Sequence, residues 1–173
     1  MNIPFQRIGS KSNSQVGNDF ELVAQEFFAK TGVKLQRNHS VLIGIAKTTK
    51  RHAFDLGCAT LKMLVECKSH RWTSGHNIPS AKLTVWNEAM YYFQAAPPEY
   101  QKILFVLRDL RRGTGESLAA YYVRTYGHLN LLARRSGSTM TQPKWRSALT
   151  PKVNADARWR AFGRAAVAGY LTR

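Results

Sequence analysis

The stretch HAFDLGCATLKMLVECKS, residues 52–69, decides the fold. Its two halves, 52–59 and 62–69, each alternate with a period of two, which is typical of half-buried β-strands. A symmetric turn between the halves predicts an antiparallel hairpin with Asp55 opposite Glu66. One face is then wholly apolar and is expected in the core: Phe54, Leu56, Cys58, Met63, Val65 and Cys67. The other face carries Ala53, Asp55, Gly57, Ala59, Lys62, Leu64, Glu66 and Lys68.

The charged residues on this second face predict a metal site. Directly opposed residues have Cβ atoms roughly 5 Å apart, so Asp55 and Glu66 repel each other unless a cation or a proton lies between them. Ligation by oxygen atoms alone suits Mg²⁺ or Mn²⁺. Lys68 shares the face and is suited to orient an attacking water and to stabilise charge on a phosphoryl group. The alternative is a surface hairpin in which Lys68 simply forms an ion pair with one carboxylate.

Helices and strands are expected on both sides of the hairpin. Apolar residues at helical spacing predict a helix from Asn18 to Lys30, and strand-type residues follow over 33–45. Further elements are expected as a basic turn at 47–51, a helix from Pro79 to Gln94, strands at 101–108 and 118–126, a short helix at 128–135 and a basic helix at 155–171. The chain thus divides into a flexible N-terminal arm (1–15), an α/β domain (16–135) and a basic linker with a C-terminal helical extension (136–173).

The order of a helix, a strand and then FD…ECK on adjacent strands resembles the PD-(D/E)xK nuclease superfamily, with its restriction-endonuclease-like fold. The resemblance covers roughly residues 17–126. It extends to Holliday-junction resolvases and small restriction-type endonucleases. Phe54 stands where the family name has proline, a position that varies. The fold implied is a mixed central β-sheet flanked by helices, here with a basic C-terminal extension.

The resemblance also implies roles for individual residues. Asp55 and Glu66 would be metal ligands, with the Cys67 carbonyl as a third, and Lys68 would be the catalytic lysine. In several branches of the superfamily a glutamate on the first helix reaches the metal, and Glu21 occupies the corresponding place. A capping or solvated role for Glu21 is the alternative.

The formal net charge of +16, from 26 Lys and Arg against 10 Asp and Glu, indicates a polyanionic partner. We expect DNA, duplex or branched, with RNA left open, an acidic protein as the alternative and no membrane partner. The residues expected to contact nucleic acid are His70, Arg71, Trp72, His76, Lys82, Arg108, Arg111 and Arg112. Trp72 would stack on a base and the arginines would contact phosphates. The alternatives are a core position for Trp72 and a metal site made by the two histidines.

Several classes of protein are excluded. The sequence has no phosphate-binding loop and no CxxC pair, and its two cysteines cannot build a disulfide scaffold. No apolar run suggests a membrane span or a secretory signal, so we expect a cytoplasmic protein of bacterial, archaeal or phage type. The function expected is a Mg²⁺-dependent endonuclease acting on DNA, branched DNA included. The alternatives are a non-catalytic nucleic-acid-binding module of the same fold and an interaction protein with an acidic partner. A homodimer suits the cutting of two strands.

Overall fold

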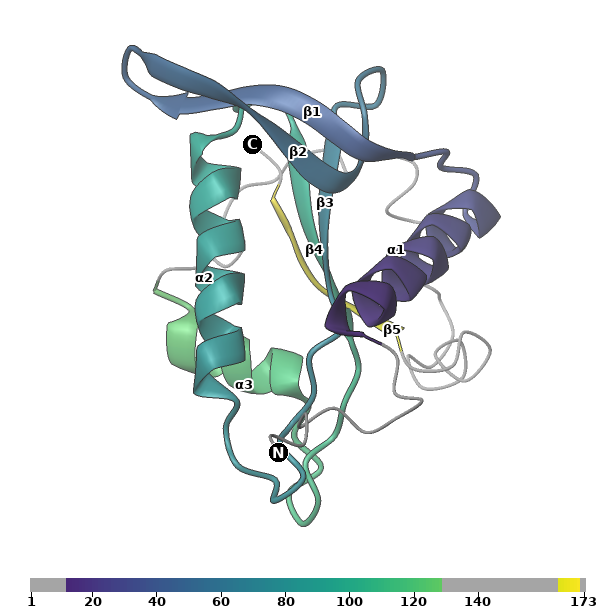
Figure 1. The fold of residues 1–173 in the computed structure, drawn as a ribbon, viewed down its shortest axis with the longest axis vertical. Coiled ribbons are helices and arrows are strands. Elements are labelled where there is room, and N and C mark those ends of the chain that lie inside the picture. The colour runs from purple at the N-terminus through teal and green to yellow at the C-terminus, as the bar shows by residue number, and fades with distance from the viewer. Residues whose placement is uncertain (1–11, 129–164, 172–173) are drawn as a thin grey trace, which may run out of the picture.

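The computed structural model describes residues 12–128 and 165–171 (Figure 1). The elements follow in the order α1 (Asn13–Lys30), β1 (Gln36–Ile45), β2 (Thr48–Cys58), β3 (Met63–Lys68), α2 (Ser80–Ala95), β4 (Gln101–Leu107), α3 (Leu118–Tyr126) and β5 (Ala165–Leu171). The strands form one mixed sheet in the order β1-β2-β3-β4-β5. Neighbouring strands are antiparallel except β3 and β4, which are parallel and are joined by α2. The predicted mixed α/β class, a sheet flanked by helices, is confirmed.

Helices cover both faces of the sheet, and each face has its own apolar core. On one face, Phe20, Phe27 and Phe28 of α1 surround Phe105 of β4. On the other face lie α2 and α3 (Figure 1), and the fully buried Trp86 belongs to the core on this side. The central strands β3 and β4 are therefore buried on both sides, as parallel strands usually are.

The strand β2 changes faces halfway along its length, which corrects the predicted apolar face. Leu56 packs in the α1-side core, as predicted, but Phe54 packs in the α2-side core, where its ring stacks on Phe93. The pairing of β1 with β2 is interrupted between these two positions, where Asn38 and Asp55 do not pair. Asn38 has φ 54°, a left-handed conformation that breaks the alternation of a strand. Side chains on the two sides of this interruption therefore enter different layers.

Residues 118–126 form the helix α3, although their tyrosine and valine content predicts a strand. The Ser117 hydroxyl accepts a hydrogen bond from the Ala120 N–H (3.0 Å) and caps the helix. The buried side chains of α3 recur at helical spacing, with Tyr122 fully buried against α2. The cap and this burial outweigh the intrinsic strand preference.

Residues 165–171 form the strand β5, so the predicted helix over 155–171 is wrong in this part. β5 pairs antiparallel with β4, whose outer edge would otherwise present unpaired N–H and C=O groups. The rest of that helix, the linker and most of the helix predicted at 128–135 lie outside the described residues.

Two predicted boundaries also move. α1 begins at Asn13 instead of Asn18, because the Ser12 hydroxyl accepts a hydrogen bond from the Gln15 N–H (3.1 Å) and caps the helix. β2 begins at Thr48, so most of the predicted basic turn belongs to the strand. Residues 1–11 of the predicted N-terminal arm lie outside the described part of the chain. The helix expected from Pro79 and the strand expected at 101–108 are confirmed as α2 and β4.

Candidate active site

The site begins where β2 and β3 separate. Three residue pairs join these strands, Leu56 with Val65, Gly57 with Leu64 and Cys58 with Met63, and they have the register that the sequence predicts. One step further along this register Asp55 and Glu66 are opposite each other, and there the pairing ends. From this point β2 continues against β1 alone, whereas β3 stays paired with β4. Side chains, not backbone, therefore fill the gap between the two strands.

Asp55 bridges this gap. Its Oδ2 accepts a hydrogen bond from the Cys67 N–H at 2.6 Å, in place of the missing backbone pair. Burial and the charge of Glu66 raise the pKa of Asp55 to about 6, although the Cys67 N–H and Lys68 act in the opposite direction. The Asp55 carboxylate thus lacks sufficient compensating positive charge.

Glu66 is the more buried of the two carboxylates, with 6% of its surface exposed. Lys68 Nζ donates a hydrogen bond to Glu66 Oε2 at 2.6 Å, and His52 Nε2 lies 3.9 Å from Glu66 Oε1. Burial opposes ionisation of Glu66, but His52 and Lys68 outweigh it and keep the pKa of Glu66 below its usual value. Burial likewise opposes charge on Lys68, but Glu66 outweighs it and raises the pKa of Lys68. Both groups are therefore charged at neutral pH.

Glu21 lies at the edge of the site and not at its centre. Its Oε2 accepts a hydrogen bond from Arg37 Nη2 at 2.6 Å, and the same nitrogen also donates to Asn18 Oδ1 at 3.2 Å. The charge of Glu21 contributes to the raised pKa of Asp55, so the two carboxylates are within electrostatic range. In this structure Glu21 forms an ion pair with Arg37, and its role as a metal ligand stays a prediction.

Sequence reasoning missed Arg37 and His52, which both come from the β1–β2 hairpin. Arg37 pairs with Leu56 across the two strands, next to the site. The His52 ring is held between Phe54, 4.8 Å away between ring centroids, and Tyr92 of α2, 4.0 Å away. The signal for both residues is the β1–β2 register, which the sequence obscures because residues 47–51 predict a basic turn.

The donor atoms present fit Mg²⁺ or Mn²⁺. Asp55 and Glu66 each use only one carboxylate oxygen in a hydrogen bond with another described residue, which leaves the second oxygen of each for a cation. The Cys67 N–H points towards β2, and because both backbone groups of a strand residue point to the same edge, its carbonyl does too. A divalent cation would also relieve the repulsion that raises the pKa of Asp55.

Two further observations limit the ligand set. Among residues 12–128, no group of three or more His, Cys, Asp or Glu side chains is arranged to hold a metal ion, so backbone and water oxygens must complete it. The Cys67 side chain packs against the α1-side core, and burial raises the pKa of its thiol well above the usual value. The ligand from this residue would thus be its carbonyl oxygen, as predicted, and not its sulfur.

The segment after β3 differs from its predicted role. Trp72 is only 6% exposed and packs edge-on against Tyr121, so it belongs to the core and cannot stack on a base. His70 Nδ1 accepts a hydrogen bond from Trp86 Nε1 at 2.7 Å. Burial, followed by the charges of Lys82 and Lys68, lowers the pKa of His70 to about 4. His70 is therefore neutral at pH 7 and can offer a phosphate only an N–H.

The loop after β4 is hydrogen-bonded to the segment after β3. Arg111 Nε donates to the His76 carbonyl at 2.9 Å, and its guanidinium lies 5.0 Å from the Trp72 ring centroid. The backbone N–H of Trp72 donates in turn to Asp109 Oδ2 at 2.9 Å. Arg71 and Arg112 are exposed beside these contacts, Arg108 is half-buried and Lys82 is exposed on α2. Apart from Lys82, the predicted basic residues thus gather on two connected loops that follow the C-terminal ends of β3 and β4.

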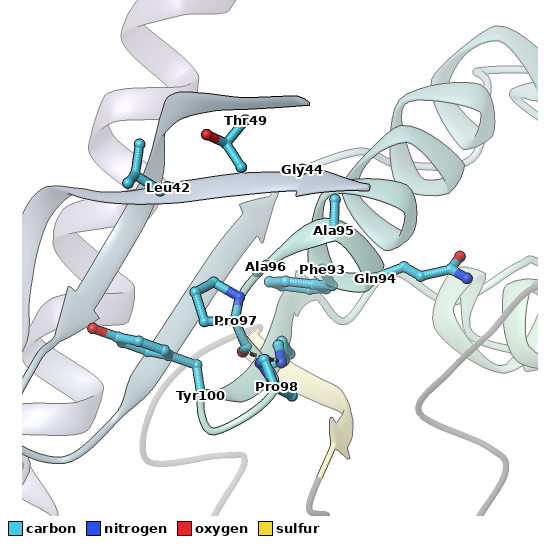
Figure 2. Close-up of a pocket in the computed structure, with 11 residues that line it drawn as sticks. Leu42, Gly44, Thr49, Phe93, Gln94, Ala95, Ala96, Pro97, Pro98 and Tyr100 are labelled. Atoms are coloured by element: carbon cyan, nitrogen blue, oxygen red, sulfur yellow. Dashed lines mark hydrogen bonds between the residues drawn. The ribbon is translucent and has the colours of Figure 1, made fainter. Parts of the chain in front are cut away.

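A separate pocket of about 500 Å³ lies between the β1–β2 hairpin and the C-terminal end of α2 (Figure 2). Leu42 and Thr49 line it from the hairpin, and residues 93–98 line it from α2 and the segment that follows. Lys102, which also lines the pocket, donates a hydrogen bond to the Pro97 carbonyl at 2.7 Å. Neither carboxylate of the site lines this pocket, so it is not part of the candidate active site.

The comparisons with known proteins identify no relative: no family model, no curated protein and no solved structure matches the chain. Within the described residues, no helix has the length and apolar character needed to cross a membrane. The functional argument therefore rests on the geometry and charge of Asp55, Glu66 and Lys68.

Proposed function

We propose that this protein is a metal-dependent endonuclease of the restriction-endonuclease-like type, which hydrolyses phosphodiester bonds of DNA. The observation that carries the proposal is the separation of β2 and β3 at Asp55 and Glu66, with Lys68 hydrogen-bonded to Glu66 at 2.6 Å. A buried carboxylate, Glu66, that faces a half-buried one, Asp55, destabilises a fold. A hairpin that serves only as structure has no need of this arrangement, whereas a metal site requires it.

Each residue has a definite role in this proposal. Asp55, Glu66 and the Cys67 carbonyl would hold a divalent cation, which supplies Lewis-acid stabilisation of the phosphate when it is bound. Lys68 is held in its charged form by Glu66, so its ammonium can orient the attacking water and stabilise charge that develops on the phosphoryl group. The Cys67 N–H fixes the orientation of the Asp55 carboxylate before any cation arrives.

The charge of the chain supports a polyanionic substrate. The formal net charge is +16, and exposed Arg71 and Arg112 lie on the two loops that follow β3 and β4. Basic groups around a carboxylate pair offset the repulsion between those carboxylates and a phosphate backbone. A small acidic substrate would not need so large a surplus of positive charge.

The experiment compares Glu66→Gln with Glu99→Gln, a matched control in the exposed segment between α2 and β4. Both variants and the wild type are incubated with supercoiled plasmid, a branched DNA junction and RNA, each with Mg²⁺, Mn²⁺ or EDTA. We expect metal-dependent cutting of DNA by the wild type and by Glu99→Gln, and none by Glu66→Gln. Binding without cutting in every metal would favour the non-catalytic module. The absence of both binding and cutting would overturn both proposals.

A further inference from the structure

The β1–β2 hairpin continues well beyond the rest of the sheet. β3 pairs with β2 only at residues 56–58, whereas β1 and β2 stay paired as far as Ile45 and Thr48. Residues 39–54 thus form a two-stranded ribbon that closes on a short turn. This ribbon is called the arm from here on, and it is distinct from the N-terminal arm predicted at 1–15. Figure 1 shows the hairpin passing over one end of α2 and extending past it.

The arm is anchored on one face and open on the other. Val41 and Ile43 are buried in the α2-side core, and they keep the ribbon in place. On the other face 56% of Leu42 is accessible to solvent, and on the first face, beyond the core, so is 57% of Ile45. Leu42 is paired with the exposed Arg51. The open face therefore combines an apolar and a cationic side chain.

The charge of the arm has one sign. No Asp or Glu occurs between Glu26 and Asp55. Lys47 is exposed at the tip, and Lys50 and Arg51 are exposed along β2; within the described residues none of the three forms an ion pair. Arg51 shares the face of its partner Leu42, whereas Lys50 shares the face of its partner Ile43. Uncompensated cations on both faces of an exposed ribbon are suited to a polyanion.

The arm starts at the candidate active site. His52 lies 3.9 Å from Glu66, and Lys47, in the turn just before β2, is five residues away in the sequence. At about 3.3 Å per residue, the tip lies roughly 17 Å from the site, or about half of the ~34 Å helical turn of duplex DNA. The major groove of B-form DNA, about 12 Å wide, admits a two-stranded β-ribbon.

We propose that the arm inserts into the major groove of B-form duplex DNA next to the phosphate that is cut. The position of the cut rests on the proposed function, but the binding does not. Lys47, Lys50 and Arg51 contact phosphates along the groove walls, and Leu42 and Thr49 meet base edges. The major groove of A-form RNA is too deep and narrow for such a ribbon, so the arm selects DNA duplexes.

The test measures binding of the full chain in EDTA, where no cutting occurs. Fluorescence anisotropy compares a 20-bp DNA duplex, an RNA duplex of the same sequence and single-stranded DNA at about 0.1 M salt. The arm variant replaces Lys47, Lys50 and Arg51 with Gln. The matched control replaces three exposed cations elsewhere, Lys30, Lys34 and Arg124, so both variants lose the same charge.

For the arm variant we expect affinity for duplex DNA to fall by about 10²-fold and the log–log salt slope to decrease by about 2.7, which corresponds to three lost phosphate contacts. The control variant should change by less than about tenfold. The wild type should prefer the DNA duplex to the RNA duplex, and the arm variant should lose this preference. Far-UV circular dichroism should be the same for all three proteins.

Equal losses in the two triple variants would overturn the inference, because the arm would then contribute only bulk charge. Equal binding of the DNA and RNA duplexes by the wild type would overturn it as well, since no groove would be selected. Both results leave the proposed function intact, because they are independent of Glu66. Conversely, loss of duplex preference in the arm variant together with no cutting by the wild type would support the arm and contradict the nuclease.

Discussion

Asp55→Asn is expected to stabilise the metal-free protein, although it removes a proposed metal ligand. Asp55 has a raised pKa, about 6 against an ordinary value of 3.8, because of burial and the nearby Glu66. An unfolded chain therefore loses the Asp55 proton more readily than the folded one as pH rises. The folded protein therefore loses stability as the pH rises from about 4 to about 6, and the full destabilisation remains above pH 6.

The magnitude follows from the size of the shift. About two pKa units at roughly 1.4 kcal/mol per unit give an upper value of about 3 kcal/mol. Asp55 is partly exposed, so solvent screening reduces this value. We expect the asparagine variant to be more stable by about 1–3 kcal/mol at pH 7.5. The amide oxygen can still accept the hydrogen bond from the Cys67 N–H, so the local fold is kept.

The assay is urea denaturation in EDTA at pH 4 and pH 7.5, with Glu99→Gln as the control. The gain from Asp55→Asn should be present at pH 7.5 and absent at pH 4. Mn²⁺ at about 100 times its Kd should then stabilise the wild type by about 2.7 kcal/mol and leave the variant unchanged. A variant that is less stable than the wild type at pH 7.5 would refute the reasoning, because Asp55 would then be a structural residue.

Two further predictions concern Lys68 and Ser117. Lys68→Ala removes the ammonium that donates to Glu66, so single-turnover cleavage should fall by about 10²–10³-fold. Mn²⁺ affinity measured by calorimetry should hold or rise slightly, and its loss would indicate that Lys68 instead holds the hairpin together. Ser117→Ala removes the cap of α3 and should cost about 1 kcal/mol in urea denaturation, with no effect on Mn²⁺ affinity. An unchanged stability would show that the cap is not needed.

The hairpin register could be predicted because it depends on local information. Period-two alternation and a short turn specify which residues of β2 and β3 face each other, and the three observed pairs agree. The opposition of Asp55 and Glu66 and the position of Lys68 follow from that register. Their burial does not, because it depends on α1 and α2 packing on the two faces of the sheet.

The contacts of His52 and Arg37 could not be predicted, because they depend on the pairing of β1 with β2. That pairing is interrupted at Asn38, and no sequence pattern predicts the left-handed backbone of this residue. The burial of Trp72 is also a tertiary effect, since it requires α3 to be a helix that brings Tyr121 against the indole ring. Ser117 is a readable capping signal for that helix, although the tyrosines that follow favour a strand.

The central claim, that Asp55 and Glu66 together bind a divalent cation, is tested most directly by titrating the purified chain with Mn²⁺ and counting bound ions by electron paramagnetic resonance. The account predicts saturable binding to the wild type and to Glu99→Gln, with none at the same concentrations in Glu66→Gln. Equal Mn²⁺ binding by all three proteins, or no binding by the wild type at millimolar Mn²⁺, would contradict it.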